Sequence, residues 1–441
     1  MMVHAHISSR ASLLRALTAV LLWLGCAQGA AAAGLTVAWT ANSEANIAGY
    51  IVSYGAAAGV HSDSVNVAAA VTRVRLENLN VGARYFVVVR AINSGGQVSG
   101  PSIEVNGLAT DVLPAAAAGA VQTYYAEGAS GFFDTYVLLA NPSATPTLAT
   151  VDFLLDGGGV LRRQYPLAGN ARYTIWTNKI PELVTRSFAT TVTAPLPILV
   201  ERAMYFTGPH GAFEEGHASA AVPSGARDWF LAEGSTGDWF ETFVLISNPN
   251  ASAVNATIRY LTPGGVARTE TRTLPPTSRT TIRVDGLPGL ESTDVSCSIS
   301  ATGNIIVERS MYWPGVPGPW RGAHNSVGIT TLRTRWGLAE GEVGGPDGAS
   351  TYVLLANPGS TAANTTLTFY REVGAPIVVT RTVPAGSRQT VAAADIGLGS
   401  GEAFGVVVQS SVPIAVERSM YWNYQGVLWT SGTNETGTPL N

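Results

Sequence analysis

Cysteine is almost absent from the sequence. Of 441 residues only Cys26 and Cys297 are cysteines, and Cys26 lies in an N-terminal segment that we expect to be removed from the mature protein. An exported chain with one remaining thiol has no internal disulfide framework, so hydrophobic cores must hold its domains. Cys297 belongs to the alternating run 294–300, which is typical of a strand. We therefore interpret Cys297 as a buried packing residue rather than a reactive thiol.

Charge is also scarce. Charged residues make up 13% of the chain, against about 25% in an average protein, and the formal net charge is −4. A nucleic-acid-binding surface normally needs a basic face, so nucleic acid is excluded as an expected partner. Glycine and proline are abundant instead, at 48 and 24 residues. That composition is typical of β-sandwiches whose strands are joined by turns.

Long apolar runs are missing too. A bilayer-spanning helix needs about 20 apolar residues, and the run 16–25 is too short. It follows Arg10 and Arg15 and precedes the small residues 27–33, a pattern that predicts a signal peptide over residues 1–33. Trp23 disfavours a lipoprotein anchor at Cys26. We expect an exported protein with no transmembrane segment in its mature chain, located extracellularly, at the cell surface or in the periplasm.

One ten-residue sequence motif occurs three times. It contains Val-Glu-Arg followed by Met-Tyr, with its glutamates at Glu201, Glu308 and Glu417, spaced by 107 and 109 residues. This period indicates duplication of a whole domain rather than a short solenoid repeat. Each copy begins with Ala-Glu-Gly (126–128, 232–234, 339–341) and has a strand ending in Asn-Pro (141–142, 248–249, 357–358). Turn signals every 8–12 residues predict about seven strands per copy, as in an immunoglobulin-like sandwich.

The recurring charges are interpreted as structural ion pairs. Arg202 shares its strand face with apolar residues, so we expect it to emerge at the rim of a core and to need a carboxylate. The predicted pairs are Glu127–Arg202, Glu233–Arg309 and Glu340–Arg418. The opposite glutamates, Glu201, Glu308 and Glu417, are expected to pair with Arg172, Arg279 and Arg388. A catalytic carboxylate pair, as in glycoside hydrolases, is the alternative, but a triplicated catalytic pair without a cleft-forming insertion is not expected.

No residues point to catalysis, a cofactor or a metal. The sequence has no nucleophile elbow, phosphate-binding glycine loop or dinucleotide fingerprint. His217 and His324 occupy equivalent positions, but their neighbourhoods lack a ligand set of three or four residues, and we expect them at the surface. The predicted catalytic, cofactor-binding and metal-binding sets are therefore empty, and the expected protein is not an enzyme.

Aromatic residues near the end of the second and third copies are the candidate ligand contacts. They are Trp313, Trp320, Trp422 and Trp429. Aromatic rings on irregular loops can present flat faces to sugars or to partner proteins. The alternative is that they fill the ends of the sandwiches. Sugar binding predicts that Trp320 and Trp429 are exposed and coplanar, whereas a spacer predicts that they are packed.

The segment before the repeats resembles a fibronectin type III domain. The resemblance depends on Trp39, on Tyr50 and Tyr54, and on Leu79 six residues before Tyr85, which matches the family's tyrosine corner. It implies a seven-stranded sandwich that serves as a spacer or a binding module. The repeats in turn resemble an uncharacterised repeat of about 107 residues found in exported bacterial proteins, for which no activity is established.

Together these observations predict an all-β chain, with a fibronectin type III-like sandwich followed by three tandem immunoglobulin-like sandwiches. The expected boundaries are 1–33 for the signal peptide, 34–112 for the first domain, and 113–222, 223–330 and 331–441 for repeats 1, 2 and 3. The predicted function is an extracellular spacer, adhesion or matrix-binding array whose partners are a polysaccharide or a surface protein. The alternative is a carbohydrate-binding accessory protein that uses its loop aromatics.

Overall fold

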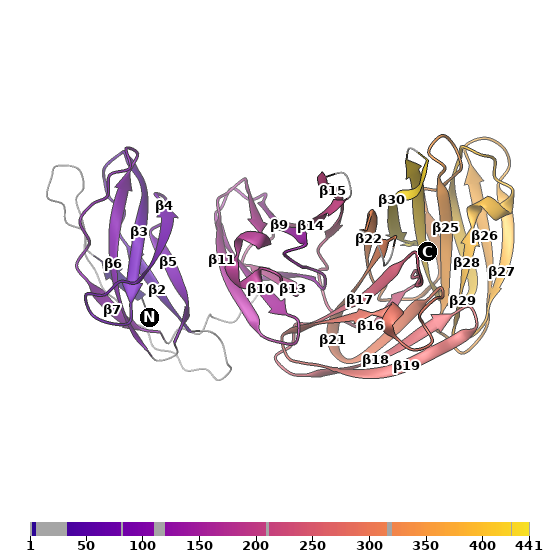
Figure 1. Cartoon of the computed structure of the whole chain (residues 1–441), viewed down its shortest axis with the longest axis horizontal. Helices are drawn as coiled ribbons and strands as arrows, with labels where there is room; N and C mark the ends of the chain where they lie inside the picture. The colour runs from indigo at the N-terminus through magenta and orange to yellow at the C-terminus, as the bar shows by residue number, and fades with distance from the viewer. Residues whose placement is uncertain are drawn as a thin grey trace. The chain divides into compact units, whose positions relative to one another are not determined.

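The structure is a computed structural model that describes residues 2–5, 33–80, 83–109, 120–208, 211–314, 320–424 and 426–440. The predicted signal peptide, including Cys26, falls almost entirely outside these ranges. The chain divides into two compact units, residues 1–117 and 118–441 (Figure 1). The described secondary structure is almost entirely β, with a few short 3-10 turns, so the predicted fold class is confirmed. None of the described helices is long and apolar enough to cross a bilayer.

The first unit is a sandwich of two sheets. One sheet has the order β4 (Asp63–Ala68), β3 (Ile47–Gly55), β6 (Arg84–Asn93), β7 (Val105–Leu108), and the other has the order β1 (Met2–Ala5), β2 (Ala33–Trp39), β5 (Arg73–Leu79). Trp39 and Tyr50 meet edge to face in the core, with ring centroids 5.3 Å apart. The Tyr85 hydroxyl accepts a hydrogen bond from the backbone N–H of Asn80 at 3.2 Å. The predicted tyrosine corner is therefore present.

Repeat 1 is a second sandwich, built from two four-stranded sheets. The first has the order β11 (Val160–Leu167), β10 (Thr147–Leu155), β13 (Phe188–Ala194), β8 (Val121–Tyr125), and the second β12 (Ala171–Trp176), β9 (Phe133–Asn141), β14 (Leu199–Gly208), β15 (Gly211–Ala220). Two 3-10 turns, η1 (Thr177–Lys179) and η2 (Pro181–Leu183), follow β12. Pro195 and Pro197 lie between β13 and β14, where the missing N–H groups interrupt the ladder.

Repeats 2 and 3 have the same plan, except that one long strand passes through both sheets. Repeat 2 contains β16 (Ala226–Leu231), β17 (Glu241–Asn248), β18 (Val254–Thr262), β19 (Gly265–Leu274), β20 (Ser278–Arg283), η3 (Val284–Gly286), the long β21 (Ser296–Trp313) and β22 (Gly322–Val327). Repeat 3 contains β23 (Arg333–Leu338), β24 (Glu342–Val343), β25 (Ser350–Asn357), β26 (Ala363–Arg371), β27 (Ile377–Val383), β28 (Ser387–Ala392), η4 (Ala393–Ile396), the long β29 (Glu402–Tyr424), β30 (Val427–Thr436) and β31 (Thr438–Pro439).

The three repeats share parts of their hydrophobic cores. Ala126 and Val222 of repeat 1 belong to the same buried cluster as the core of repeat 2. Ala232 and Ile329 of repeat 2 belong in the same way to the core of repeat 3. The boundaries predicted after residues 222 and 330 fall between β15 and β16 and between β22 and β23. Neighbouring repeats therefore meet through buried surface, and the chain between them is not a free linker.

Candidate functional site

A buried ion cluster joins repeat 1 to repeat 2, at a contact that we call the first junction. Arg202 extends from β14 and its guanidinium lies between two carboxylates, with Nη2 3.1 Å from Glu127 and Nη1 2.7 Å from Glu308. Nη1 also donates to the backbone carbonyl of Glu127 at 2.9 Å. All three side chains are at most 3% exposed. Glu127 comes from repeat 1 and Glu308 from β21 of repeat 2, so the guanidinium ties the two repeats together.

Each carboxylate of the first junction is bound by donors of the other repeat. Glu127 accepts hydrogen bonds from Tyr312 at 3.0 Å and from Ser310, both on β21. Glu308 accepts from the backbone N–H of Ala126 at 3.0 Å. These exchanges satisfy groups that would be costly to bury alone.

The second junction, between repeats 2 and 3, repeats this arrangement. Arg309 lies 3.3 Å from Glu233 and 2.7 Å from Glu417 of β29. Tyr421 donates to Glu233 at 2.9 Å, and the backbone N–H of Ala232 donates to Glu417 at 2.7 Å. In repeat 3, Nη1 of Arg418 lies 2.5 Å from Glu340, but the Glu340 side chain is 64% exposed.

The sequence predicted half of this pairing. The pairs Glu127–Arg202, Glu233–Arg309 and Glu340–Arg418 are confirmed. The pairing of the opposite glutamates within their own repeats was wrong, because Glu308 and Glu417 bind the arginine of the preceding repeat. The missed signal is that the strand face of these glutamates is also largely apolar in each copy. A strand with two apolar faces is buried on both sides, here by a neighbouring repeat.

The two histidines lie inside the junctions, so their predicted surface location was wrong. Nε2 of His217 lies 3.6 Å from Glu127, and Nε2 of His324 is 3.2 Å from the Tyr421 hydroxyl. Burial lowers the pKa of both imidazoles below the ordinary value. Both are therefore neutral at pH 7 and act as polar packing groups. Among the described ranges, no group of three His, Cys, Asp or Glu residues is placed to hold a metal ion.

Burial and neighbouring opposite charges have opposite effects on the pKa values of the carboxylates and guanidiniums. Burial raises the pKa of the Glu127 carboxyl, but His217 (in its protonated form), Arg202 and the Ser310 hydroxyl together hold that pKa below the ordinary value. Burial lowers the pKa of Arg202, and Glu308 and Glu127 more than compensate, so the net shift is upward. Both groups are therefore ionised at neutral pH.

Three of the four candidate tryptophans, Trp313, Trp320 and Trp429, lie at the junctions. Trp313 is completely buried, and its Nε1 donates to the carbonyl of Trp429. Trp320 is half-buried and stacks on Tyr312 at 4.2 Å, while Trp429 is half-buried with its ring centroid 5.0 Å from that of Tyr421. Trp422 is also half-buried. This packing is what the spacer interpretation expects, and ligand binding by these rings stays a prediction.

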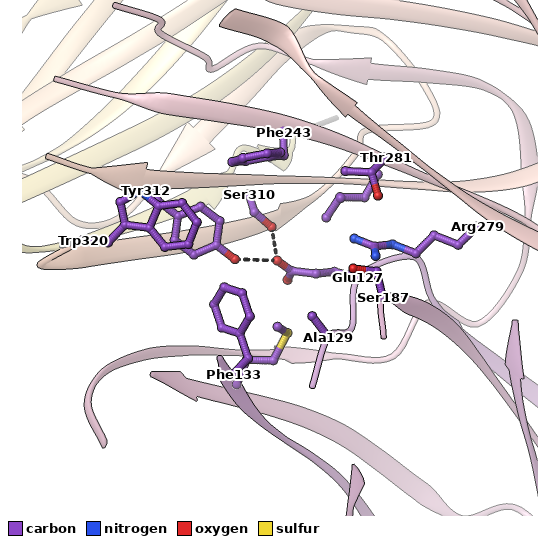
Figure 2. Close-up of a pocket in the computed structure, with 12 residues that line it drawn as sticks. Glu127, Ala129, Phe133, Ser187, Phe243, Arg279, Thr281, Ser310, Tyr312 and Trp320 are labelled. Carbon is purple, nitrogen blue, oxygen red and sulfur yellow. Dashed lines mark hydrogen bonds between the residues drawn. The ribbon is translucent and has the colours of Figure 1, made fainter. Parts of the chain in front are cut away.

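A cavity of about 120 Å³ lies in the first junction (Figure 2). Its apolar lining includes Phe133, Phe243 and Trp320, and its polar lining includes Glu127 and Arg279. In Figure 2 the guanidinium of Arg279 points toward the space beside Glu127 and Ser187. The sequence did not predict this cavity, because its walls come from two repeats.

The face that binds the preceding repeat in repeats 2 and 3 is more exposed in repeat 1. Tyr205 is 38% exposed, whereas the equivalent Tyr312 and Tyr421 are 4% and 3% exposed. A row of four rings follows this face, with neighbouring centroids 5.7–6.0 Å apart: Trp176, Tyr136, Tyr205 and Phe213. Tyr205 and Phe213 both remain more than a third exposed.

Comparisons with known proteins identify the first unit. The family profile described as Fibronectin type III domain matches residues 26–107. The first unit is a fibronectin type III domain. This confirms the resemblance inferred from Trp39, Leu79 and Tyr85. No curated protein sequence matches the chain.

Solved structures give only weak likenesses. Thermotoga maritima 1070 is 14% identical, covers 24% of this chain and 94% of its own, and has a TM-score of 0.23. The Anabaena sensory rhodopsin transducer is 30% identical, with 19% and 92% covered and a TM-score of 0.18. A tetra-tandem repeat from the extending region of a large adhesion protein is 13% identical, with 92% and 99% covered and a TM-score of 0.12. Scores this low support no functional argument.

Proposed function

We propose that this protein is an exported, non-enzymatic bacterial array in which the three repeats form a stiff spacer that supports adhesion or matrix binding. The observation that carries the proposal is the buried Glu–Arg–Glu cluster present at both junctions. Bending a junction would separate Arg202 from Glu308, or Arg309 from Glu417, and leave buried charges uncompensated. Breaking one buried pair costs about 3–5 kcal/mol, so bent states would be rare.

The stiffness is testable by distance measurement between spin labels. One label is placed on an exposed strand position of repeat 1 and one on repeat 3, in the full chain, and pulsed electron resonance records the distance distribution. We expect a narrow distribution in the parent, and a broad one after the double substitution Glu308→Gln/Glu417→Gln. Glu201→Gln is the matched control, because Glu201 is the equivalent residue on the more exposed face of repeat 1. A parent distribution as broad as that of the double variant would contradict the spacer proposal.

Export and adhesion need their own measurements. In a bacterial host, the chain with its natural N-terminus is expected to appear outside the cytoplasm, beginning near residue 34. Beads coated with the mature protein are expected to retain surface proteins or polysaccharide more strongly than beads coated with albumin. Accumulation of the uncleaved chain in the cytoplasm would contradict the export proposal.

Carbohydrate binding is the second candidate, and the partly exposed ring row of repeat 1 favours it. Aromatic rings with an exposed face can stack on sugars, and here Phe213 is 49% exposed. Retention on insoluble cell-wall and plant polysaccharides tests it. Loss of retention in Tyr205→Ala/Phe213→Ala would place the site on this row, and loss in Trp320→Ala/Trp429→Ala would place it at the tryptophans predicted from the sequence. No retention of the parent would leave the spacer and protein-adhesion function.

A further inference from the structure

The first junction contains a buried guanidinium, that of Arg279, for which no ion-pair partner is present among the described residues. Arg279 lies on β20 and is 4% exposed, yet its Nε and Nη1 have no hydrogen-bond acceptor. No carboxylate in the described part of the chain lies within ion-pair distance of it. Burial is the largest influence on this group and lowers its pKa, although Glu127 and Asp156 act in the opposite direction. A charged group buried in this way normally has a bound counterion or a paired carboxylate.

The second junction shows which group is missing. Arg388 is the equivalent residue, and its Nη1 lies 3.2 Å from Asp294 and donates to the carbonyl of Gly234 at 3.0 Å. The hydroxyl of Thr390 donates to the same Asp294 carboxylate at 2.9 Å. Arg388 is therefore held by a carboxylate from the preceding repeat, and Arg279 has no such bond.

The position equivalent to Asp294 is Ser187. Each of the two residues directly precedes a residue whose backbone N–H donates to the carbonyl of the glycine in the Ala-Glu-Gly motif. These hydrogen bonds run from Phe188 to Gly128 and from Val295 to Gly234, both at 2.9 Å. Repeat 1 thus has a short hydroxyl where repeat 2 has a carboxylate. Ser187, Arg279 and Glu127 all line the cavity of the first junction (Figure 2). The cavity therefore lies beside the position that a carboxylate occupies in the second junction.

Asp156 does not replace the missing carboxylate. It is exposed, on the turn after β10, and it accepts a hydrogen bond from Thr281 at 3.3 Å. Its charge favours the ionised form of Arg279, but the two groups form no ion pair within 4 Å. The guanidinium therefore keeps open hydrogen-bonding capacity on its cavity side.

The cavity suits a small anion with an apolar end. A volume of about 120 Å³ equals the space of about four waters in the liquid, at about 30 Å³ each. The walls opposite Arg279 include the rings of Phe133, Phe243 and Trp320, which offer little to a fully hydrated inorganic ion. The neighbouring Arg202, Glu127 and Glu308 are already paired, so one added negative charge would reproduce the charge balance of the second junction.

We propose that the first junction binds a small aliphatic carboxylate, of the size of acetate or propionate. Its carboxylate accepts hydrogen bonds from Arg279 and the Ser187 hydroxyl, and its alkyl end contacts the aromatic wall. Binding this group stabilises the contact between repeats 1 and 2, because the ligand bridges side chains of both. The site is an addition to the proposed spacer function and does not depend on adhesion.

The test uses the full mature chain and sodium acetate as the probe. Saturation-transfer NMR and calorimetric titration measure binding, with sodium chloride keeping the ionic strength constant. We expect saturable binding of one acetate per chain and a melting temperature that rises with acetate concentration. Ser187→Asp is expected to lower the affinity for acetate at least tenfold, and to raise the melting temperature in its absence. Arg279→Gln is expected to abolish binding.

A matched variant in the second junction gives the converse result. Asp294→Ser leaves Arg388 without its carboxylate, so we expect a lowered melting temperature that acetate restores, and a stoichiometry of two acetates per chain. Non-saturable acetate binding in the parent would overturn the proposal. So would an equal response to chloride, which would indicate an inorganic anion site. A melting temperature lowered as much by Asp156→Asn as by Asp294→Asn would show that Asp156 neutralises Arg279, and would also overturn it.

Discussion

Neutralising Glu308 is expected to weaken the first junction far more than neutralising the equivalent glutamate of repeat 1. Glu308 is completely buried and binds Arg202 at 2.7 Å and the backbone N–H of Ala126 at 3.0 Å. In Glu308→Gln the amide oxygen can still accept from Ala126, but the charge that compensates Arg202 is lost. Removing one partner of a buried ion pair costs about 3–5 kcal/mol. Because Glu127 remains beside Arg202, we expect the low end, about 3 kcal/mol.

Scanning calorimetry of the full chain measures this loss. For a unit of this size each kcal/mol shifts the melting temperature by about 2 °C, so the unfolding transition of the second unit should fall by about 6 °C. If repeat 1 separates from the others, its transition should also split from the main peak. Glu201→Gln is the control, since Glu201 is exposed, and its trace should match the parent. Equal melting temperatures for the two variants would refute the claim that the ion cluster holds the repeats together.

Three further measurements follow from the buried groups. Burial lowers the pKa of His324 and His217 in the folded state, so the unfolded state binds more protons on acidification and the free energy of unfolding should decrease below about pH 6.5. The double variant His217→Thr/His324→Thr should flatten this part of the profile of stability against pH. An unchanged slope in the variant would contradict this assignment. Burial raises the pKa of Cys297 to about 12, so the native thiol should resist alkylation at pH 8 and react only after unfolding. Trp313→Ala should destabilise by about 3–5 kcal/mol in urea titrations and the half-buried Trp422→Ala by clearly less, whereas equal losses would contradict the burial difference.

The overall fold was predictable because its signals are local. A single sequence shows the alternation of apolar and polar residues along strands, the turn residues at regular intervals and a motif repeated at a spacing of 107 residues. The Glu127–Arg202 pair could be predicted as well. An arginine on an apolar strand face needs a carboxylate, and the Ala-Glu-Gly motif offers one in every copy. The packing of neighbouring repeats was not predictable in the same way. The periodicity of a strand shows that its second face is apolar, but it does not identify the part of the protein that buries this face.

The cavity illustrates a second limit. Its lining combines Glu127 and Ser187 of repeat 1 with Arg279 and Tyr312 of repeat 2, so no contiguous motif marks it. One signal was present in the sequence, namely serine at 187 where the next copy has aspartate at 294. Its meaning required the observation that Asp294 binds Arg388. A single exchange between repeats became informative only when the partner residue was known.

The differences between the copies also bear on whether repeat 1 of one chain can dock onto repeat 3 of another. Ser310 donates to Glu127, and Asn325 to Glu308, in the first junction, yet the equivalent residues on the more exposed face of repeat 1 are Ala203 and Ala218. In repeat 3, Thr433 replaces His324 and leaves the exposed Glu340 without an imidazole neighbour.

Both of these faces therefore lack polar groups that the two junctions use. If a second copy docked repeat 1 onto repeat 3, Glu340 would meet Ala203 instead of a serine hydroxyl, and its carboxylate would be buried with fewer donors. Buried carboxylates with missing donors penalise that contact, while the same charges stabilise the two junctions inside the chain. The residues at these positions in repeats 1 and 3 thus disfavour a contact between repeat 1 of one chain and repeat 3 of another.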